Sequence, residues 1–154
     1  MNHNRRTLLK GSLAASAMGI AVGAGLLTPK AVLAAWPKAT FESTSTDSAV
    51  AALGGNPTKS DKIKLKAPDI AENGAVVPVT ITSSIDNTEA ISILVAKNGQ
   101  PLSATFNLGP KTQGYVSTRL KMGKTSDVIA IVKADGKLYS ATKQVKVTIG
   151  GCGG

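Results

Sequence analysis

The sequence predicts a mainly β protein: an antiparallel β-sandwich preceded by a short helix and followed by a flexible, glycine-rich arm. Three observations lead to this fold class. After Ser60, seven short segments alternate apolar and polar residues with a period of two, as half-buried strands do. Turn dipeptides such as Asn73-Gly74 and Asp135-Gly136 separate several of these segments. The last five residues are four glycines around Cys152, and glycine has no side chain that could pack.

Residues 1–34 have the order of a secretory signal peptide. Arg5 and Arg6 form a twin arginine, a mildly apolar stretch runs over residues 11–27, and a small-residue site ends at Ala34. This order predicts a cleaved signal of the twin-arginine (Tat) route and therefore a periplasmic protein. Cleavage after Ala35 is the alternative. A membrane anchor is the other interpretation, but 17 residues weakened by glycine are close to the lower limit for a span.

The mature chain, residues 35–154, is long enough for one domain with a hydrophobic core. The signal contains four of the 18 basic residues and none of the nine acidic ones, which leaves a net charge of +5. This charge indicates either a solvated basic surface or attraction of anions and acidic protein faces. Arg119 is the only arginine that remains, and aromatic residues are few, so nothing favours nucleic acid as a partner.

The chain lacks the residues that most catalytic mechanisms require. The only histidine is His3, inside the signal, and Cys152 is the only cysteine. Neither a Ser-His-Asp nor a Cys-His arrangement can be built, and the usual zinc, copper and haem sites lack ligands. Asp69 and Glu72 resemble a carboxylate pair, but we interpret them as solvated loop acids beside a turn. We therefore expect no metal, no cofactor and no enzymatic activity.

Residues 35–60 are predicted to be an N-terminal helical segment. The helical pattern runs from Phe41 to Leu53, with several cap residues between Ser43 and Ser48. Gly54-Gly55 then ends the helix, and a proline follows at position 57. Trp36 and Phe41 are expected to anchor this segment to the main body.

Residues 61–149 are predicted to form the sandwich. Seven strands with hairpin turns at regular spacing indicate the immunoglobulin-like architecture, without the cysteine pair of antibody domains. Asp135-Gly136 predicts a type I′ hairpin. Pro78 cannot donate a ladder hydrogen bond, so we expect its strand at a sheet edge. The apolar positions lie in the runs 63–65, 77–85, 91–95, 102–108, 116–122, 128–132 and 138–149.

Residues 150–154 are predicted to be a thin, flexible arm that presents one thiol. An extended chain covers at most about 3.3–3.6 Å per residue, so Cys152 can reach roughly 10 Å beyond Ile149. No helix start or base lies next to it in the sequence, and the terminal carboxylate disfavours a thiolate. The pKa of Cys152 is therefore expected at or above its ordinary value. This setting favours a thiol that reacts inside the active site of another protein.

Other roles for Cys152 remain open from the residues alone. An exposed cysteine in an oxidising compartment can cross-link two copies of a protein. The alternative function is therefore an exported immunoglobulin-like structural or interaction module that dimerises through a Cys152 disulfide. An engineered conjugation tag is a further possibility.

Taken together, these motifs resemble the SoxY family of the bacterial sulfur-oxidation (Sox) system. The similar features are the twin-arginine signal, the helix that ends in Gly-Gly, the sandwich and the terminal Gly-Gly-Cys-Gly-Gly motif. The stretch from Pro68 to Val79 is also similar to that family. The resemblance covers nearly the whole chain, and the terminal motif is its most specific part.

The resemblance implies a periplasmic carrier in thiosulfate oxidation, with sulfur intermediates held covalently on Cys152. Gly150, Gly151, Gly153 and Gly154 correspond to its flexible arm. The implied partners are a SoxZ-like subunit that forms a heterodimer, a c-type cytochrome that conjugates thiosulfate, a sulfate-releasing hydrolase and a sulfur dehydrogenase. A SoxZ-like subunit without its own signal would travel with this chain. Export as a complex would explain a Tat signal on a chain that needs no cofactor.

Overall fold

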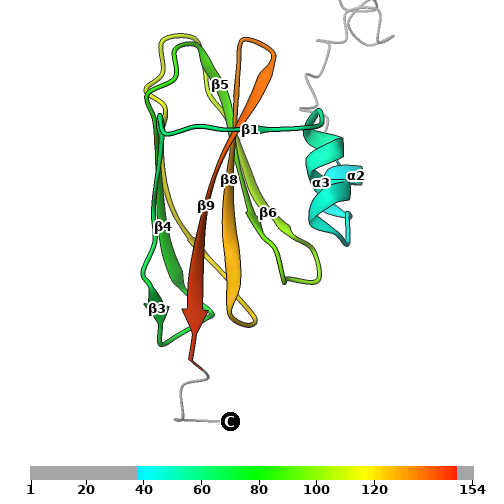
Figure 1. Cartoon of the computed structure of the whole chain (residues 1–154), viewed down its shortest axis with the longest axis vertical. Helices are drawn as coiled ribbons and strands as arrows, with labels where there is room; N and C mark the ends of the chain where they lie inside the picture. Colours follow the sequence, from blue (N-terminus) through cyan, green and yellow to red (C-terminus); the bar gives the residue numbers. More distant parts are fainter. Residues whose placement is uncertain (1–37, 149–154) are drawn as a thin grey trace, which may run out of the picture. The chain divides into compact units, whose positions relative to one another are not determined.

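A computed structural model describes residues 38–148, which form two β-sheets and two short helices (Figure 1). The predicted signal peptide 1–34, Trp36 and the predicted arm 150–154 lie outside the described residues. The structure confirms the mainly β fold class and the antiparallel sandwich. The strands are β1 (Thr58–Lys59), β2 (Ile63–Lys66), β3 (Ile70–Ala71), β4 (Val77–Ser83), β5 (Thr88–Val95), β6 (Leu102–Asn107), β7 (Tyr115–Leu120), β8 (Ser126–Ala134) and β9 (Lys137–Val147).

The predicted helix, Phe41 to Leu53, begins too early: α3 covers Thr46–Leu53, and a separate short helix, α2 (Lys38–Phe41), precedes it. Ser45 sets the start of α3 as its N-cap, because its backbone is extended and its side chain accepts a hydrogen bond from the Ser48 amide at 3.1 Å. The expected end at Gly54-Gly55 is confirmed. Gly54 has φ 125°, and its amide donates to carbonyls of the last helical turn.

The seven predicted strands are β2 and β4 to β9, and they lie in two sheets. The larger sheet has the order β1-β9-β8-β5-β6, and β3 also pairs with β9. The smaller sheet has the order β2-β4-β7. The expectation that the strand with Pro78 lies at an edge is wrong, because β4 is the central strand. Pairing with β2 ends at Thr80, however, so Pro78 lies beyond the end of its neighbour.

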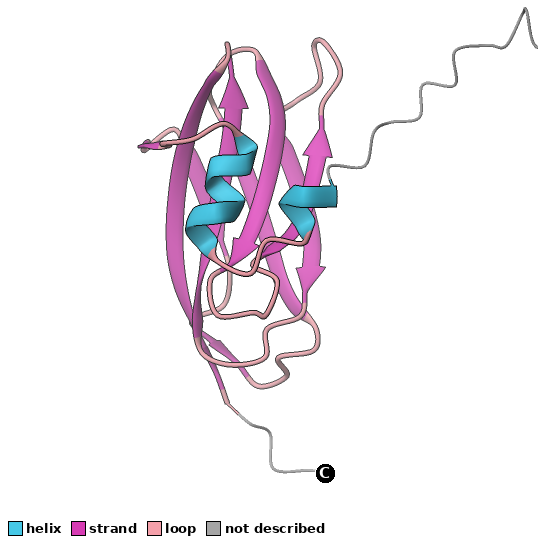
Figure 2. Ribbon diagram, turned by 90° about the vertical axis from the view of Figure 1, so that its right-hand side faces the viewer, coloured by secondary structure: helices cyan, strands magenta, loops and turns pink. Residues whose placement is uncertain are grey.

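The larger sheet is covered on both faces, which explains the unbroken burial of residues 91–95 in β5. Ile91, Ile93 and Val95 belong to the cluster between the two sheets. Leu94 points the other way and packs in a second cluster with Ala49 of α3. The partly buried Phe41 also joins this second cluster, as the sequence predicts. Figure 2 shows the helices against this sheet.

The β8–β9 hairpin has the predicted type I′ turn. Asp135 and Gly136 have φ values of 48° and 69°, and the ladder closes with the pair Ala134–Lys137. This tight turn sets the register of β9, so that Tyr139, Ala141 and its later odd-numbered neighbours face the core. Strand β9 then runs to the opposite end of the sandwich (Figure 1).

Candidate functional site

Strand β9 leads directly to the segment that holds the predicted site residues. Cys152 and its neighbours Gly150, Gly151, Gly153 and Gly154 lie outside the described residues, as do Arg5 and Arg6. The structure describes the base of this segment, which is formed by Val147 and Thr148. Cys152 is the fourth residue after Thr148. At about 3.3–3.6 Å per residue, Cys152 can lie at most roughly 14 Å from Thr148.

The end of β9 is held by hydrogen bonds on both sides. On one side, β3 pairs with it in parallel, and the Thr148 amide donates to the Ala71 carbonyl at 3.1 Å. The Lys146 amide donates to the Asp69 carbonyl at 2.9 Å. On the other side, the Val147 amide donates to the Thr125 hydroxyl at 3.0 Å. The backbone therefore has hydrogen-bond partners up to the last described residue.

Gly74 packs directly against this base. The Met122 amide donates to the Gly74 carbonyl at 2.6 Å. A Cβ atom at position 74 would collide with the Met122 carbonyl oxygen and lie 2.8 Å from a methyl group of Val147. The sequence predicts a turn at Asn73-Gly74, and the Asn73 side chain accepts from the Ala75 amide at 2.9 Å as in an Asx turn. Gly74 therefore has a second role besides the turn, since it allows the chain to approach β9 closely. The local sequence pattern does not indicate this role.

Lys143 occupies a core-facing position of β9 at the rim of the sandwich. Its ammonium group donates to the Ala67 carbonyl at 2.7 Å and pairs with the Asp69 carboxylate at 2.9 Å. Asp69 is 89% exposed, so this ion pair contributes little to stability. Glu72 is also exposed, so both acids are solvated, as expected. The Pro68–Val79 stretch thus supplies the contacts of β3, Asp69 and Gly74 to β9.

Replacing Lys143 with methionine is expected to lower the free energy of unfolding by about 1 kcal/mol. The loss comes from the hydrogen bond to the Ala67 carbonyl, because methionine keeps the packing of the stem. Lys146→Met is the matched control, since Lys146 is exposed on the same strand and the charge change is identical. Urea unfolding of both variants measures the difference. Equal effects would contradict a structural role for Lys143.

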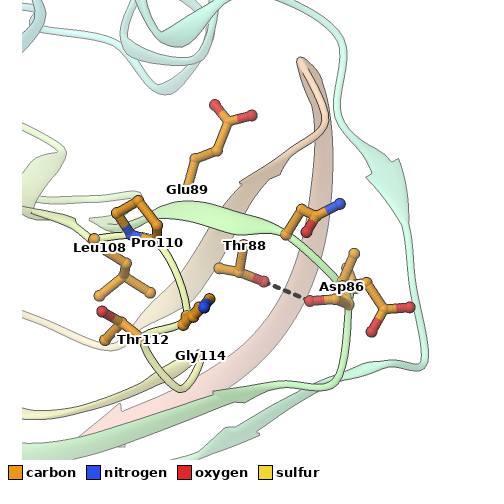
Figure 3. Close-up of a pocket in the computed structure, with 11 residues that line it drawn as sticks. Asp86, Thr88, Glu89, Leu108, Pro110, Thr112 and Gly114 are labelled. Carbon is orange, nitrogen blue, oxygen red and sulfur yellow. Dashed lines mark hydrogen bonds between the residues drawn. The ribbon is translucent and has the colours of Figure 1, made fainter.

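One pocket of about 560 Å³ lies between the β4–β5 and β6–β7 loops (Figure 3). Thr88 and Pro110 line it, and the Thr88 hydroxyl donates to the Ile85 carbonyl at 2.8 Å. Thr88 also pairs with Ala134 beside the β8–β9 turn. Because β9 spans about 33 Å from that turn to Val147, this pocket lies beyond the reach of Cys152.

The described residues contain no cluster of three or more histidine, cysteine, aspartate or glutamate side chains that could hold a metal ion. No helix within residues 38–148 is long and apolar enough to cross a membrane.

Comparison with known proteins identifies the family. The family model of the sulfur oxidation protein SoxY matches residues 49–152. A solved structure of the sulfur carrier protein SoxY from Chlorobium limicola f thiosulfatophilum is 46% identical, with a TM-score of 0.61. This match covers 67% of the present chain and 96% of that chain. A search of curated proteins found no match. The chain therefore belongs to the SoxY family of carrier proteins, which act with the other components of the sulfur-oxidation system.

Proposed function

We propose that the protein carries the sulfur intermediates of thiosulfate oxidation covalently on Cys152 while periplasmic partner enzymes act on them. The observation that supports this most directly is that the SoxY family match extends to residue 152, the position of the only cysteine of the chain. The anchored end of β9 supports it as well. A rigid base only four residues from the thiol lets the sandwich position Cys152 near a docked enzyme.

The chemistry is carried out by the partners. The Cys152 thiol and thiosulfate lose one proton and two electrons and form Cys152–S–S–SO₃⁻. A c-type cytochrome partner accepts the two electrons. A hydrolase then adds water across the terminal S–S bond, which releases sulfate and two protons and leaves the persulfide Cys152–S–S⁻. A sulfur dehydrogenase then accepts six electrons from the remaining sulfane sulfur, which takes its oxygen from three water molecules, releases six protons and becomes Cys152–S–SO₃⁻. In this scheme the protein is a bound substrate, not an enzyme.

Export and assembly follow from the same proposal. The twin arginine Arg5-Arg6 directs the folded chain through the Tat route. A SoxZ-like subunit forms a heterodimer with the sandwich and is exported with it. Cleavage after residue 34 or 35 gives the mature periplasmic subunit. Residues 35–60 then form the helical segment, of whose described residues only β1 (Thr58–Lys59) joins the sandwich of residues 61–149 by pairing with β9. Residues 150–154 form the carrier arm.

Intact mass spectrometry of the protein from cells grown on thiosulfate tests the proposal. We expect adducts that correspond to added sulfur and to S–SO₃⁻, that a reductant removes, and that map to Cys152. The Cys152→Ser variant should carry none of them. If the only modification is a disulfide between two copies, the protein is instead a structural module that dimerises through Cys152.

A further inference from the structure

A second pocket, of about 510 Å³, lies at the end of the sandwich from which the chain continues to Cys152. It opens between the β5–β6 hairpin and the β7–β8 loop. The ladder places it there, because Val95 pairs with Val128 and Ser126 pairs with Val145 near the end of β9. Figure 1 shows both loops at that end. The pocket is lined by Lys97, Asn98, Gly99, Gln100, Lys121, Gly123 and Lys124, and we call it the lysine pocket.

The two loops are fixed to each other by a neutral side chain. The Asn98 side-chain amide donates to the Lys121 carbonyl at 2.7 Å, and its oxygen accepts from the Gly123 amide at 3.2 Å. The Lys97 amide donates in addition to the Ser126 hydroxyl at 2.9 Å. These bonds hold lysines from separate parts of the sequence around one cavity. The arrangement is therefore built by the fold and is more than a run of charges along the chain.

The lysine pocket has three positive charges and no acidic lining residue. Lys97, Lys121 and Lys124 are exposed, and none forms an ion pair with a described residue. Like charges that share a cavity repel each other. Gly99 leaves open space beside them, since a Cβ atom there would meet no atom within 4 Å. An anionic group that entered the pocket would relieve this repulsion.

We propose that the lysine pocket binds the sulfonate group of the adduct carried on Cys152 of the same chain. The inference rests on the proposed function, which places a permanently anionic –S–SO₃⁻ group on that cysteine. Lys124 directly precedes Thr125, and the Thr125 hydroxyl is bonded to the Val147 amide. The pocket thus begins beside the base of the arm, within the roughly 14 Å that four residues can span.

Tethering makes weak contacts sufficient. A group on a short linker has an effective concentration in the millimolar range near its own domain. Ion pairs between an exposed lysine and an anion are individually weak and screened by salt. The docked adduct should therefore exchange rapidly with an undocked one, so that the pocket shields the loaded arm between enzymes without trapping it.

Chemical loading tests docking without any partner enzyme. Sodium tetrathionate converts the Cys152 thiolate to Cys152–S–S–SO₃⁻ and releases thiosulfate, whereas methyl methanethiosulfonate gives the uncharged Cys152–S–S–CH₃ and releases methanesulfinate. We expect amide NMR shifts at Gly99, Gly123 and Lys124 with the first adduct only. They should vanish at 1 M salt and in the triple variant Lys97→Gln, Lys121→Gln, Lys124→Gln.

The matched control removes three positive charges from a surface away from the lysine pocket. Lys62, Lys64 and Lys66 are exposed on or beside β2, and their triple replacement by glutamine should leave the shifts intact. Release of the S–SO₃⁻ adduct by dithiothreitol should be about twofold to fivefold slower in the unmodified pocket than in the pocket variant. Equal shifts with both adducts, or shifts that persist in the pocket variant, would overturn the proposal.

Two further experiments identify what occupies the lysine pocket. Labelled Cys152→Ser protein mixed with unlabelled loaded protein should show no shifts, and shifts there would mean that another copy supplies the arm. Free thiosulfate at the protein concentration should also produce none, and shifts there would mean a site for free anions. Because loading is chemical, failure of docking leaves the carrier proposal intact. Failure of the carrier proposal is seen separately, as an absence of native adducts on Cys152.

Discussion

Replacing Cys152 with serine should abolish thiosulfate oxidation by the assembled sulfur-oxidation system. The serine hydroxyl is similar in size to the thiol, but it cannot form the S–S bond on which every later step of the proposed scheme depends. The loss should be complete, because the chain offers no second cysteine. Thiosulfate-dependent reduction of cytochrome c by the purified components measures it. Substantial turnover with the serine variant would refute the carrier function.

Stability measurements on the same variant would show whether such a loss is chemical or comes from unfolding. The two described hydrophobic clusters are built from residues between Phe41 and Val147. Cys152→Ser should therefore change the free energy of unfolding by less than about 0.5 kcal/mol. Gly151→Pro is a companion variant, since proline fixes one backbone angle and stiffens the arm while the thiol remains. It should still accept tetrathionate but slow enzymatic turnover. Unchanged turnover would show that the arm need not be slender and adaptable.

Replacing Gly74 with alanine should destabilise the sandwich by about 1–3 kcal/mol, the range for overpacked sites. The new methyl group would collide with the Met122 carbonyl oxygen and press on Val147, so the backbone around the base of the arm must shift. The melting temperature should fall by about 4 °C for each kcal/mol in a domain of this length. Thermal unfolding measures the loss, and hydrogen exchange should show faster opening at Val147 and Thr148.

Gly99→Ala provides the matched control. Gly99 is an exposed loop glycine with open space where a Cβ atom would lie. Its replacement should leave the melting temperature nearly unchanged or raise it slightly, because alanine restricts the unfolded chain. Equal destabilisation by the two substitutions would show that the close approach of Gly74 to β9 is unimportant.

Local features of the fold could be predicted because a few adjacent residues encode them. Alternation of apolar and polar residues indicates the seven longer strands, and Asp135-Gly136 indicates the turn that starts β9. Gly54-Gly55 marks the end of α3 in the same way. Each of these signals reports a backbone geometry that neighbouring residues adopt together, so no knowledge of distant contacts is needed.

Features that depend on distant pairing could not be predicted. Strands β1 and β3 have two residues each, too few for a period, and exist because β9 provides their hydrogen-bond partners. Pro78 suggests an edge strand by its chemistry, yet it lies in the central strand, beyond the end of β2. The break before α3 depends on whether the Ser45 side chain caps a helix, which several serines nearby could equally do.

The sequence by itself determined the mainly β class and the carrier hypothesis. The alternation of apolar and polar residues, the lone cysteine among glycines and the lack of any histidine after His3 are matters of composition and order. Tertiary structure alone decided what surrounds the base of that arm. The end of β9 contacts Ala71, Thr125 and Gly74. The Asn98 side chain joins the two loops that place three lysines around one cavity. The physical reason is that burial of two hydrophobic clusters determines which sheet edges and loops become neighbours. Those clusters combine residues from distant parts of the chain, so no short stretch of the sequence predicts the result.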